Sequence, residues 1–208
     1  MAEQYASHSG MVKRHAGSDR VLHWVFAASI MFLMGSSFLP IIGIQFEWVT
    51  LHWVVGLVLL FTVCVHIWRA WLKVRLRTVW FGVADVRLAL DGLTGKDVRP
   101  GKYSPAQKLM HSGVAILVLA TLVTGLIMMV KVDTPFWERN LYLFSDHIWG
   151  VIYVVHGLAA LTLITTTMLH IYFVLRPEKR LYLRSIFVGK ISSEEHRLHH
   201  DSEKWAGD

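Results

Sequence analysis

Six histidines lie within long apolar stretches of the sequence: His23, His52, His66, His111, His156 and His170. No Asp, Glu, Lys or Arg accompanies them in these stretches. An ionisable residue in an apolar span is energetically costly, and a functional role is the default interpretation. Imidazole is a suitable donor to haem iron, and two imidazoles fill both axial positions. The histidines therefore predict haem that carries electrons and offers no open iron position to oxygen or substrate.

The spacing of four of these histidines places them at two levels. His52 and His66 are fourteen residues apart, and so are His156 and His170. In an α-helix, this interval brings two side chains to nearly the same face, about 21 Å apart along the axis. We therefore expect two haems at different depths, which together would form an electron path across a membrane.

The apolar stretches that carry the histidines are long enough to cross a membrane as helices. They comprise residues 21–42, 48–68, 109–130 and 148–175. Each matches or exceeds the roughly 20 residues that a spanning helix needs. The chain as a whole is 54% hydrophobic, with a mean hydropathy of +0.44. These features predict an all-α integral membrane protein with a bundle of four transmembrane helices.

Basic residues are distributed unevenly around these spans. All of the 21 Lys and Arg residues except Lys131 and Arg139 lie before the first span, between the second and third, or after the fourth. Because cytoplasmic segments are enriched in Lys and Arg, residues 1–20 and 176–208 are expected in the cytoplasm, flanking a transmembrane domain at 21–175. The same topology explains the net charge of +6 without nucleic-acid binding. We expect a multi-pass protein of the bacterial inner membrane.

This topology assigns the histidines to an outer and an inner level. His52 and His156 form the outer pair, whereas either His23 or His66 is deep enough to face His170 at the inner level. Spacing alone does not choose between these two. Glycines lie in the spans near both levels and suit either close approach of a porphyrin or helix packing: Gly35, Gly56, Gly125 and Gly157.

Short motifs follow one another in a specific order from about Arg20 to Trp205. They read Arg-Val-Leu-His-Trp at 20–24, Leu-His-Trp-Val-Val-Gly at 51–56, Gly-Lys-Tyr-Ser-Pro-Ala-Gln-Lys at 101–108, Val-Thr-Gly-Leu-Ile at 123–127, His-Gly at 156–157, and His-Ile-Tyr at 170–172. In their order and spacing they resemble the cytochrome b (gamma) subunit of membrane-bound respiratory formate dehydrogenase, a family of diheme cytochromes b.

The resemblance implies ligands for both haems. In that family the second and fourth spans hold the outer haem, which corresponds to His52 and His156. The first and fourth spans hold the inner haem, which corresponds to His23 and His170. The family has no histidine at the position of His66. This departure makes His66 either an alternative ligand of the inner haem or a hydrogen-bonded residue beside it.

The resemblance also implies a quinone site beside the inner haem, in the loop before the third span. Residues 104–107 read Ser-Pro-Ala-Gln, where the family has Asn-Ala-Gly-Gln. Ser104 and Gln107 are spaced as a capping box, with proline at the first helical position. A helix N-terminus also suits a quinone oxygen that gains negative charge. Ser104, Gln107 and His170 are the expected contacts to menaquinone or ubiquinone, and His111 is a further candidate.

The resemblance implies that the chain is no enzyme on its own. It would anchor an iron-sulfur subunit and a catalytic subunit that contains molybdopterin, as in that family, on the outer side and pass their electrons to quinone. Residues 132–147, which are aromatic and carry few charges, are the candidate docking surface, although an interfacial aromatic belt has the same composition. A hydrogenase, a thiosulfate or tetrathionate reductase, or another molybdenum enzyme is an alternative partner. A haem-free transporter of metal ions or protons is an alternative of another class.

Three expectations concern the cytoplasmic side. Residues 81–90 are expected to form an amphipathic surface helix. His196, His199 and His200 are expected at the surface of a charged tail and not at a metal site. Four cations are candidates to pair with haem propionates: Arg20, Arg69, Lys102 and Arg176.

Overall fold

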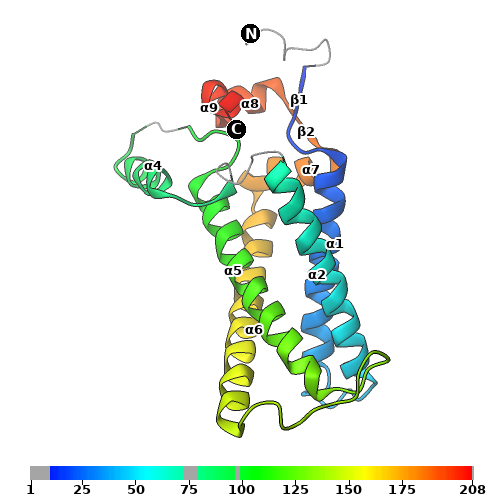
Figure 1. Cartoon of the computed structure of the whole chain (residues 1–208). Coiled ribbons are helices and arrows are strands. Elements are labelled where there is room, and N and C mark those ends of the chain that lie inside the picture. Colours follow the sequence, from blue (N-terminus) through cyan, green and yellow to red (C-terminus); the bar gives the residue numbers. More distant parts are fainter. Residues whose placement is uncertain (1–9, 73–78, 97–98, 208) are drawn as a thin grey trace. The chain divides into compact units, whose positions relative to one another are not determined.

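The structure is a computed structural model, and it describes residues 10–72, 79–96 and 99–207. Within these residues, four helices are long and apolar enough to cross a membrane (Figure 1). They are Gly17–Phe38 (α1), Trp48–Leu72 (α2), Pro105–Met128 (α5), which continues as the 3-10 turn Met129–Lys131 (η2), and Asp146–Leu175 (α6). The predicted number and order of the spans are confirmed, and the fold is that of an all-α membrane bundle.

The helices differ from the apolar stretches mainly at their ends. α1 begins at Gly17 and α5 at Pro105, because polar residues extend the first turns of both helices. α1 ends at Phe38, earlier than the predicted residue 42. The residue before a proline is disfavoured in helical conformation, so Pro40 ends the helix. A turn follows, in which Gly43 has a φ of 95° and donates its N–H to the Pro40 carbonyl at 3.1 Å.

The chain divides into two compact units. The first, here called the bundle unit, comprises Trp24–Ile67 and Val114–Met168, and thus the greater part of all four spans. Its core consists of buried apolar side chains contributed by all four helices: Ile30, Leu59, Val63, Val118, Leu122 and Leu163. Many large apolar side chains elsewhere on these helices are exposed, Phe61 and Leu158 among them. Lipid tails solvate such side chains, as a membrane-spanning bundle requires.

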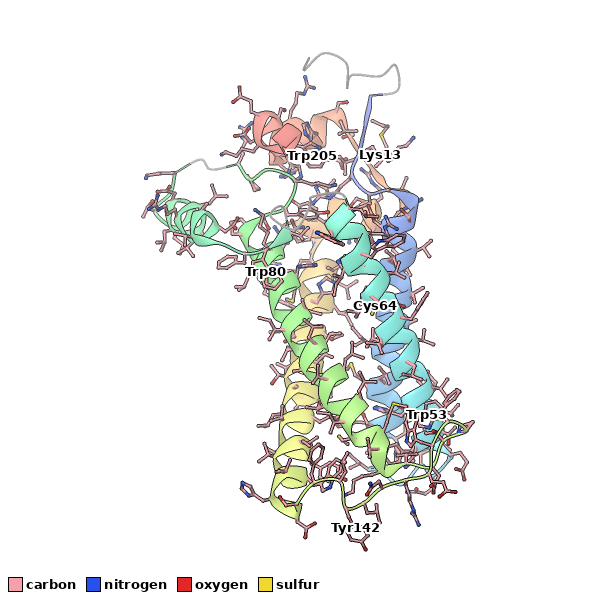
Figure 2. The ribbon with its side chains drawn as sticks, viewed as in Figure 1. Lys13, Trp53, Cys64, Trp80, Tyr142 and Trp205 are labelled. Atoms are coloured by element: carbon pink, nitrogen blue, oxygen red, sulfur yellow. The ribbon has the colours of Figure 1, made fainter. Side chains whose placement is uncertain are left out.

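The second unit comprises the remaining described residues at both ends of the chain together with those of Trp68–Gly113. In it, the strands Met11–Lys13 (β1) and Lys190–Ser192 (β2) pair antiparallel, with Val12 opposite Ile191. The neighbouring elements of the tail are Pro177–Lys179 (η3), Arg180–Val188 (α7), Ser193–His199 (α8) and Ser202–Gly207 (α9). We call residues 10–16, 99–104 and 180–207 of this unit the terminal cap. Figure 2 marks it with the labels Lys13 and Trp205.

Gly189 allows α7 to turn directly into β2. Its φ of 84° is a left-handed conformation that favours glycine. Its carbonyl accepts the backbone N–H groups of Arg14 and His15 at 2.9 and 3.0 Å. A Cβ at this position would lie 2.9 Å from the carbonyl oxygen of His15. The close approach of the two chain ends therefore depends on this residue having no side chain.

A helix at Val83–Leu93 (α4) confirms the surface helix expected at 81–90, with slightly later bounds. It is joined to the start of α5 by a salt bridge of 3.1 Å between Asp85 and Lys108, both largely buried. Asp85 also accepts the backbone N–H of Gly82 at 3.0 Å. Apolar side chains such as Leu90 and Leu93 remain exposed, so α4 is amphipathic as predicted.

Candidate functional site

The predicted outer histidines lie in the bundle unit, each near the start of its helix. His52 is in the second turn of α2 and His156 in the third turn of α6. Both side chains are half-buried, and the two imidazoles are near enough to interact electrostatically. The ring of Trp48 meets that of His52 edge to face at a centroid distance of 6.3 Å. The structure thus brings together the two residues that the sequence pairs.

Each outer histidine is also held by a hydroxyl group from a neighbouring helix. Ser36 Oγ on α1 lies 2.8 Å from His52 Nδ1, and Thr124 Oγ1 on α5 lies 2.8 Å from His156 Nδ1. Both hydroxyl residues are buried. We did not anticipate them from the sequence, where single Ser and Thr residues in an apolar span have no distinctive pattern.

The surroundings of the outer pair fit a haem. A Cβ added to Gly125 would lie 3.4 Å from His156 Cε1, so glycine lets α5 approach this imidazole closely. A Cβ added to Gly35, Gly56 or Gly157 would meet nothing within 4 Å, so none of these three packs tightly against a neighbouring helix. The two imidazoles, each with Nδ1 in a hydrogen bond, are donors that would suit haem iron.

The predicted inner histidines lie together in the other unit. His23 is on α1 and His170 on α6, and their imidazoles also interact electrostatically. His66 belongs to the bundle unit, where its ring meets that of Phe26 edge to face at 5.8 Å. The choice of His23 over His66 as an inner ligand stays a prediction, as do the other ligand assignments.

The predicted quinone residues Ser104, Gln107, His111 and His170 all belong to the unit of the inner histidines. The capping box is present: the Ser104 N–H donates to Gln107 Oε1 at 2.9 Å, and the Gln107 N–H donates to Ser104 Oγ at 3.3 Å. His111 lies half-buried on α5. The local fold therefore explains Ser104 and Gln107 through capping, and their contact to quinone stays a prediction.

The candidate propionate partners make several contacts within the protein. Arg69 pairs with Asp19 at 2.6 Å, and Arg176 pairs with Glu178 at 3.2 Å. Arg20 donates to the Phe187 carbonyl. Lys102 Nζ lies 5.5 Å from the centroid of the Tyr103 ring. Of these contacts, that of Arg69 joins α2 to α1 and that of Arg20 joins α1 to the end of α7, whereas those of Arg176 and Lys102 are local.

A buried cluster in the terminal cap contradicts the expectation for the tail histidines. His200 is 2% exposed, His196 is half-buried, and only His199 is exposed. His200 accepts a hydrogen bond from Arg14 through Nε2 at 2.9 Å and donates from Nδ1 to the Gly101 carbonyl at 2.7 Å. The expectation of a surface position was wrong for His200, because a charged tail sequence gives no sign that the tail folds back onto the N-terminal strand.

Burial and nearby cations keep two histidines of this region neutral. Burial lowers the pKa of His200 to about 4, and the Arg14 guanidinium acts in the same direction. Burial likewise lowers the pKa of His15 to about 4, again helped by Arg14 and then Lys102. Burial also lowers the pKa of Arg14 itself, although the guanidinium stays charged at neutral pH.

The comparisons with known proteins agree with this geometry. A family model described as prokaryotic cytochrome b561 matches residues 14–189, a range that contains all four spans and both histidine pairs. A search of curated proteins gave no match. Among the described residues no group of three or more His, Cys, Asp or Glu is arranged to hold a metal ion directly. The chain belongs to the prokaryotic cytochrome b561 family and is a membrane protein that transfers electrons through b-type haem.

Proposed function

We propose that this chain is a diheme cytochrome b that carries electrons between a catalytic partner on one side of the bacterial inner membrane and the quinone pool. The observation that carries the proposal is the presence of two histidine pairs, one in each unit. Each pair joins α6 to another spanning helix, and no member of one pair is shared with the other. One haem per pair would use His52 and His156 at the outer level and His23 and His170 at the inner level.

The protein would supply the ligands and surroundings of these haems. When bound, each haem provides a one-electron redox centre. His52 and His156 would hold one haem, and His23 and His170 would hold the other. The apolar core of the bundle unit, with Leu59 and Leu163 at its centre, excludes water between the helices. α6 is continuous between His156 and His170, and fourteen residues of helix correspond to about 21 Å along its axis.

We place quinone reduction at the inner level, beside Ser104, Gln107, His170 and, in addition, His111. The N-terminus of α5 supports this proposal, because its positive end suits an oxygen that gains negative charge. The Gln107 amide also retains its NH₂ group as a donor, since the capping box uses only its carbonyl oxygen. The quinone would be menaquinone or ubiquinone, and the cytoplasm would supply the protons.

The partner is proposed to be an iron-sulfur subunit with a molybdopterin-containing catalytic subunit, as in formate dehydrogenase. The supporting surface is the connection at 132–147, where Tyr142 is 92% exposed and points away from the helices in Figure 2. Lys131 lies 4.5 Å from the ring centroid of the buried Trp149 and so fixes the base of this connection. The orientation, with both termini in the cytoplasm, rests on the distribution of Lys and Arg.

The alternative partner is a hydrogenase, a thiosulfate or tetrathionate reductase, or another molybdenum enzyme. These partners can be distinguished in bacterial membranes that contain this chain by adding each candidate substrate and measuring haem reduction. Only the substrate of the actual partner enzyme should reduce the haem. Reduction by formate supports the first assignment, whereas reduction by hydrogen and not by formate would overturn it. Haem-free transport, the third hypothesis, has no support in a family that binds b-type haem.

Haem content tests the ligand assignments directly. The purified chain is expected to contain two haems b with low-spin spectra in reduced-minus-oxidised difference measurements. His156→Ala should remove one haem and His170→Ala the other, while the exposed His147→Ala serves as a control that retains both. A chain with one haem, or a His156→Ala variant with two, would contradict the proposal. Loss of haem in His66→Ala but not in His23→Ala would reverse the inner assignment.

A further inference from the structure

We propose that Ser36 and Thr124 are positioning residues that fix the tautomer of the outer histidines and raise their basicity toward haem iron. This inference rests on the proposed role of His52 and His156 as the outer ligands. It concerns two hydroxyl groups that lie on the helices next to those of the ligands.

The hydrogen bonds of Ser36 indicate which atom donates the proton in its contact with His52. A hydroxyl has one proton to donate, and Ser36 Oγ donates it to the Leu33 carbonyl at 3.1 Å. With the proton assigned to that carbonyl, the hydroxyl oxygen accepts in its contact of 2.8 Å with His52 Nδ1. Nδ1 then carries the imidazole proton, and the lone pair of the neutral ring lies on Nε2.

Thr124 repeats this arrangement at the second ligand. Its hydroxyl donates to the Ala120 carbonyl at 2.6 Å, so that its oxygen accepts from His156 Nδ1 at 2.8 Å. As at His52, the imidazole proton then lies on Nδ1 and the lone pair on Nε2.

Burial makes these bonds persistent. Ser36 is 2% and Thr124 8% exposed, and a hydroxyl or imidazole N–H without a partner is expensive in an apolar interior. Each bond also crosses between two helices, from α1 to α2 and from α5 to α6. The hydroxyls therefore present both Nε2 atoms for coordination before any haem binds.

The same bonds have an electronic consequence. An acceptor on Nδ1–H increases the electron density of the ring and makes the histidine a more basic ligand. A more basic pair of ligands stabilises ferric over ferrous iron, so the two hydroxyls lower the midpoint potential of the outer haem. A purely structural role would alter helix packing or haem retention without shifting this potential selectively.

Redox titration of purified Ser36→Ala and Thr124→Val tests the proposal, with the inner haem as an internal reference. We expect the midpoint potential of the outer haem to shift in the positive direction in each variant. The shift should be larger in the double variant, and Thr124→Ser should restore the original value. The matched controls are Ser37→Ala and Thr62→Val, whose hydroxyls donate only to backbone carbonyls of their own helices.

The outcomes separate this inference from the proposed function. Unchanged potentials in both variants, with two haems bound, would overturn the inference even if His156→Ala loses the outer haem as expected. Retention of both haems in His156→Ala would instead overturn the ligand assignment. If Ser36→Ala loses its haem, Ser36→Cys supplies a similarly sized but weaker acceptor. That variant should show the positive shift, and an unchanged potential in it would contradict the inference.

Discussion

Replacement of Arg14 by alanine should loosen the terminal cap more than any other single truncation there. The guanidinium donates to His200 Nε2 at 2.9 Å and to the Lys102 carbonyl at 2.8 Å. It also lies 4.7 Å from the ring centroid of Tyr182 and 5.4 Å from that of Trp205. One side chain thus joins the N-terminal strand, the loop before α5 and the C-terminal tail.

The expected magnitude follows from these contacts. Hydrogen bonds from a charged donor contribute about 1.5–3 kcal/mol each, and a cation over an aromatic ring about 0.5–1 kcal/mol. The desolvation of the guanidinium, which lowers the pKa of Arg14, offsets part of this stabilisation. We expect a net loss of about 2–4 kcal/mol in the free energy of cap opening. Since 1.4 kcal/mol is a factor of ten, the open population should rise by about 30- to 700-fold.

Hydrogen exchange of the backbone amides of β1 and β2 measures this opening in the intact protein. Arg184→Ala is the matched control, because Arg184 lies in the same cap but pairs with Glu195 at its surface. A surface pair contributes roughly 0–1 kcal/mol, so exchange in that variant should rise at most about fivefold. The reasoning fails if Arg14→Ala accelerates exchange no more than Arg184→Ala does.

Two further predictions concern the same cap. Because burial lowers the pKa of His200 to about 4, the open cap takes up a proton there more readily than the closed cap. Protection of the β1 and β2 amides from hydrogen exchange should therefore be complete above about pH 6.5 and decline as the pH falls toward 4. Constant protection over this window, after correction for intrinsic exchange rates, would contradict this prediction. Gly189→Ala should lower the free energy of cap opening by more than about 1 kcal/mol, since the new Cβ would lie 2.9 Å from the His15 carbonyl oxygen. Gly95→Ala is its control, because Gly95 has a similar φ of 82° but nothing lies within 4 Å of the added Cβ. Equal thermal stability of the two variants would refute the close-contact argument.

The spans and the pairing of His52 with His156 could be predicted because their signals are strong and local, whereas spacing left the partner of His170 open between His23 and His66. An apolar run of about 20 residues has few interpretations besides a spanning helix, and histidines fourteen residues apart must share a helix face. The capping box at Ser104 and Gln107 and the surface helix near Val83 were likewise predictable from short patterns. The early end of α1 also had a signal in Pro40, which the length of the apolar run concealed.

The terminal cap had no comparable signal. Strands of three residues are too short to show alternation, and β1 and β2 are distant in the sequence, so their pairing depends on tertiary contacts. The burial of His200 follows from that pairing and could not be predicted without it. Ser36 and Thr124 were missed for a different reason: a hydroxyl in an apolar span usually bonds to its own helix, and these two do so as well.

The contacts of Arg14 in the cap have a further consequence for quinone chemistry at the proposed site. Arg14 and His200 bind the carbonyls of Lys102 and Gly101, which lie two and three residues before Ser104 of the capping box at the start of α5. Opening the cap would therefore release the loop that positions Gln107, while the bundle unit keeps its own core. Arg14→Ala should then slow quinone reduction yet leave both haems bound. Such a separation of effects would mean that the two chain ends serve the quinone site, whereas the spanning helices serve the haems.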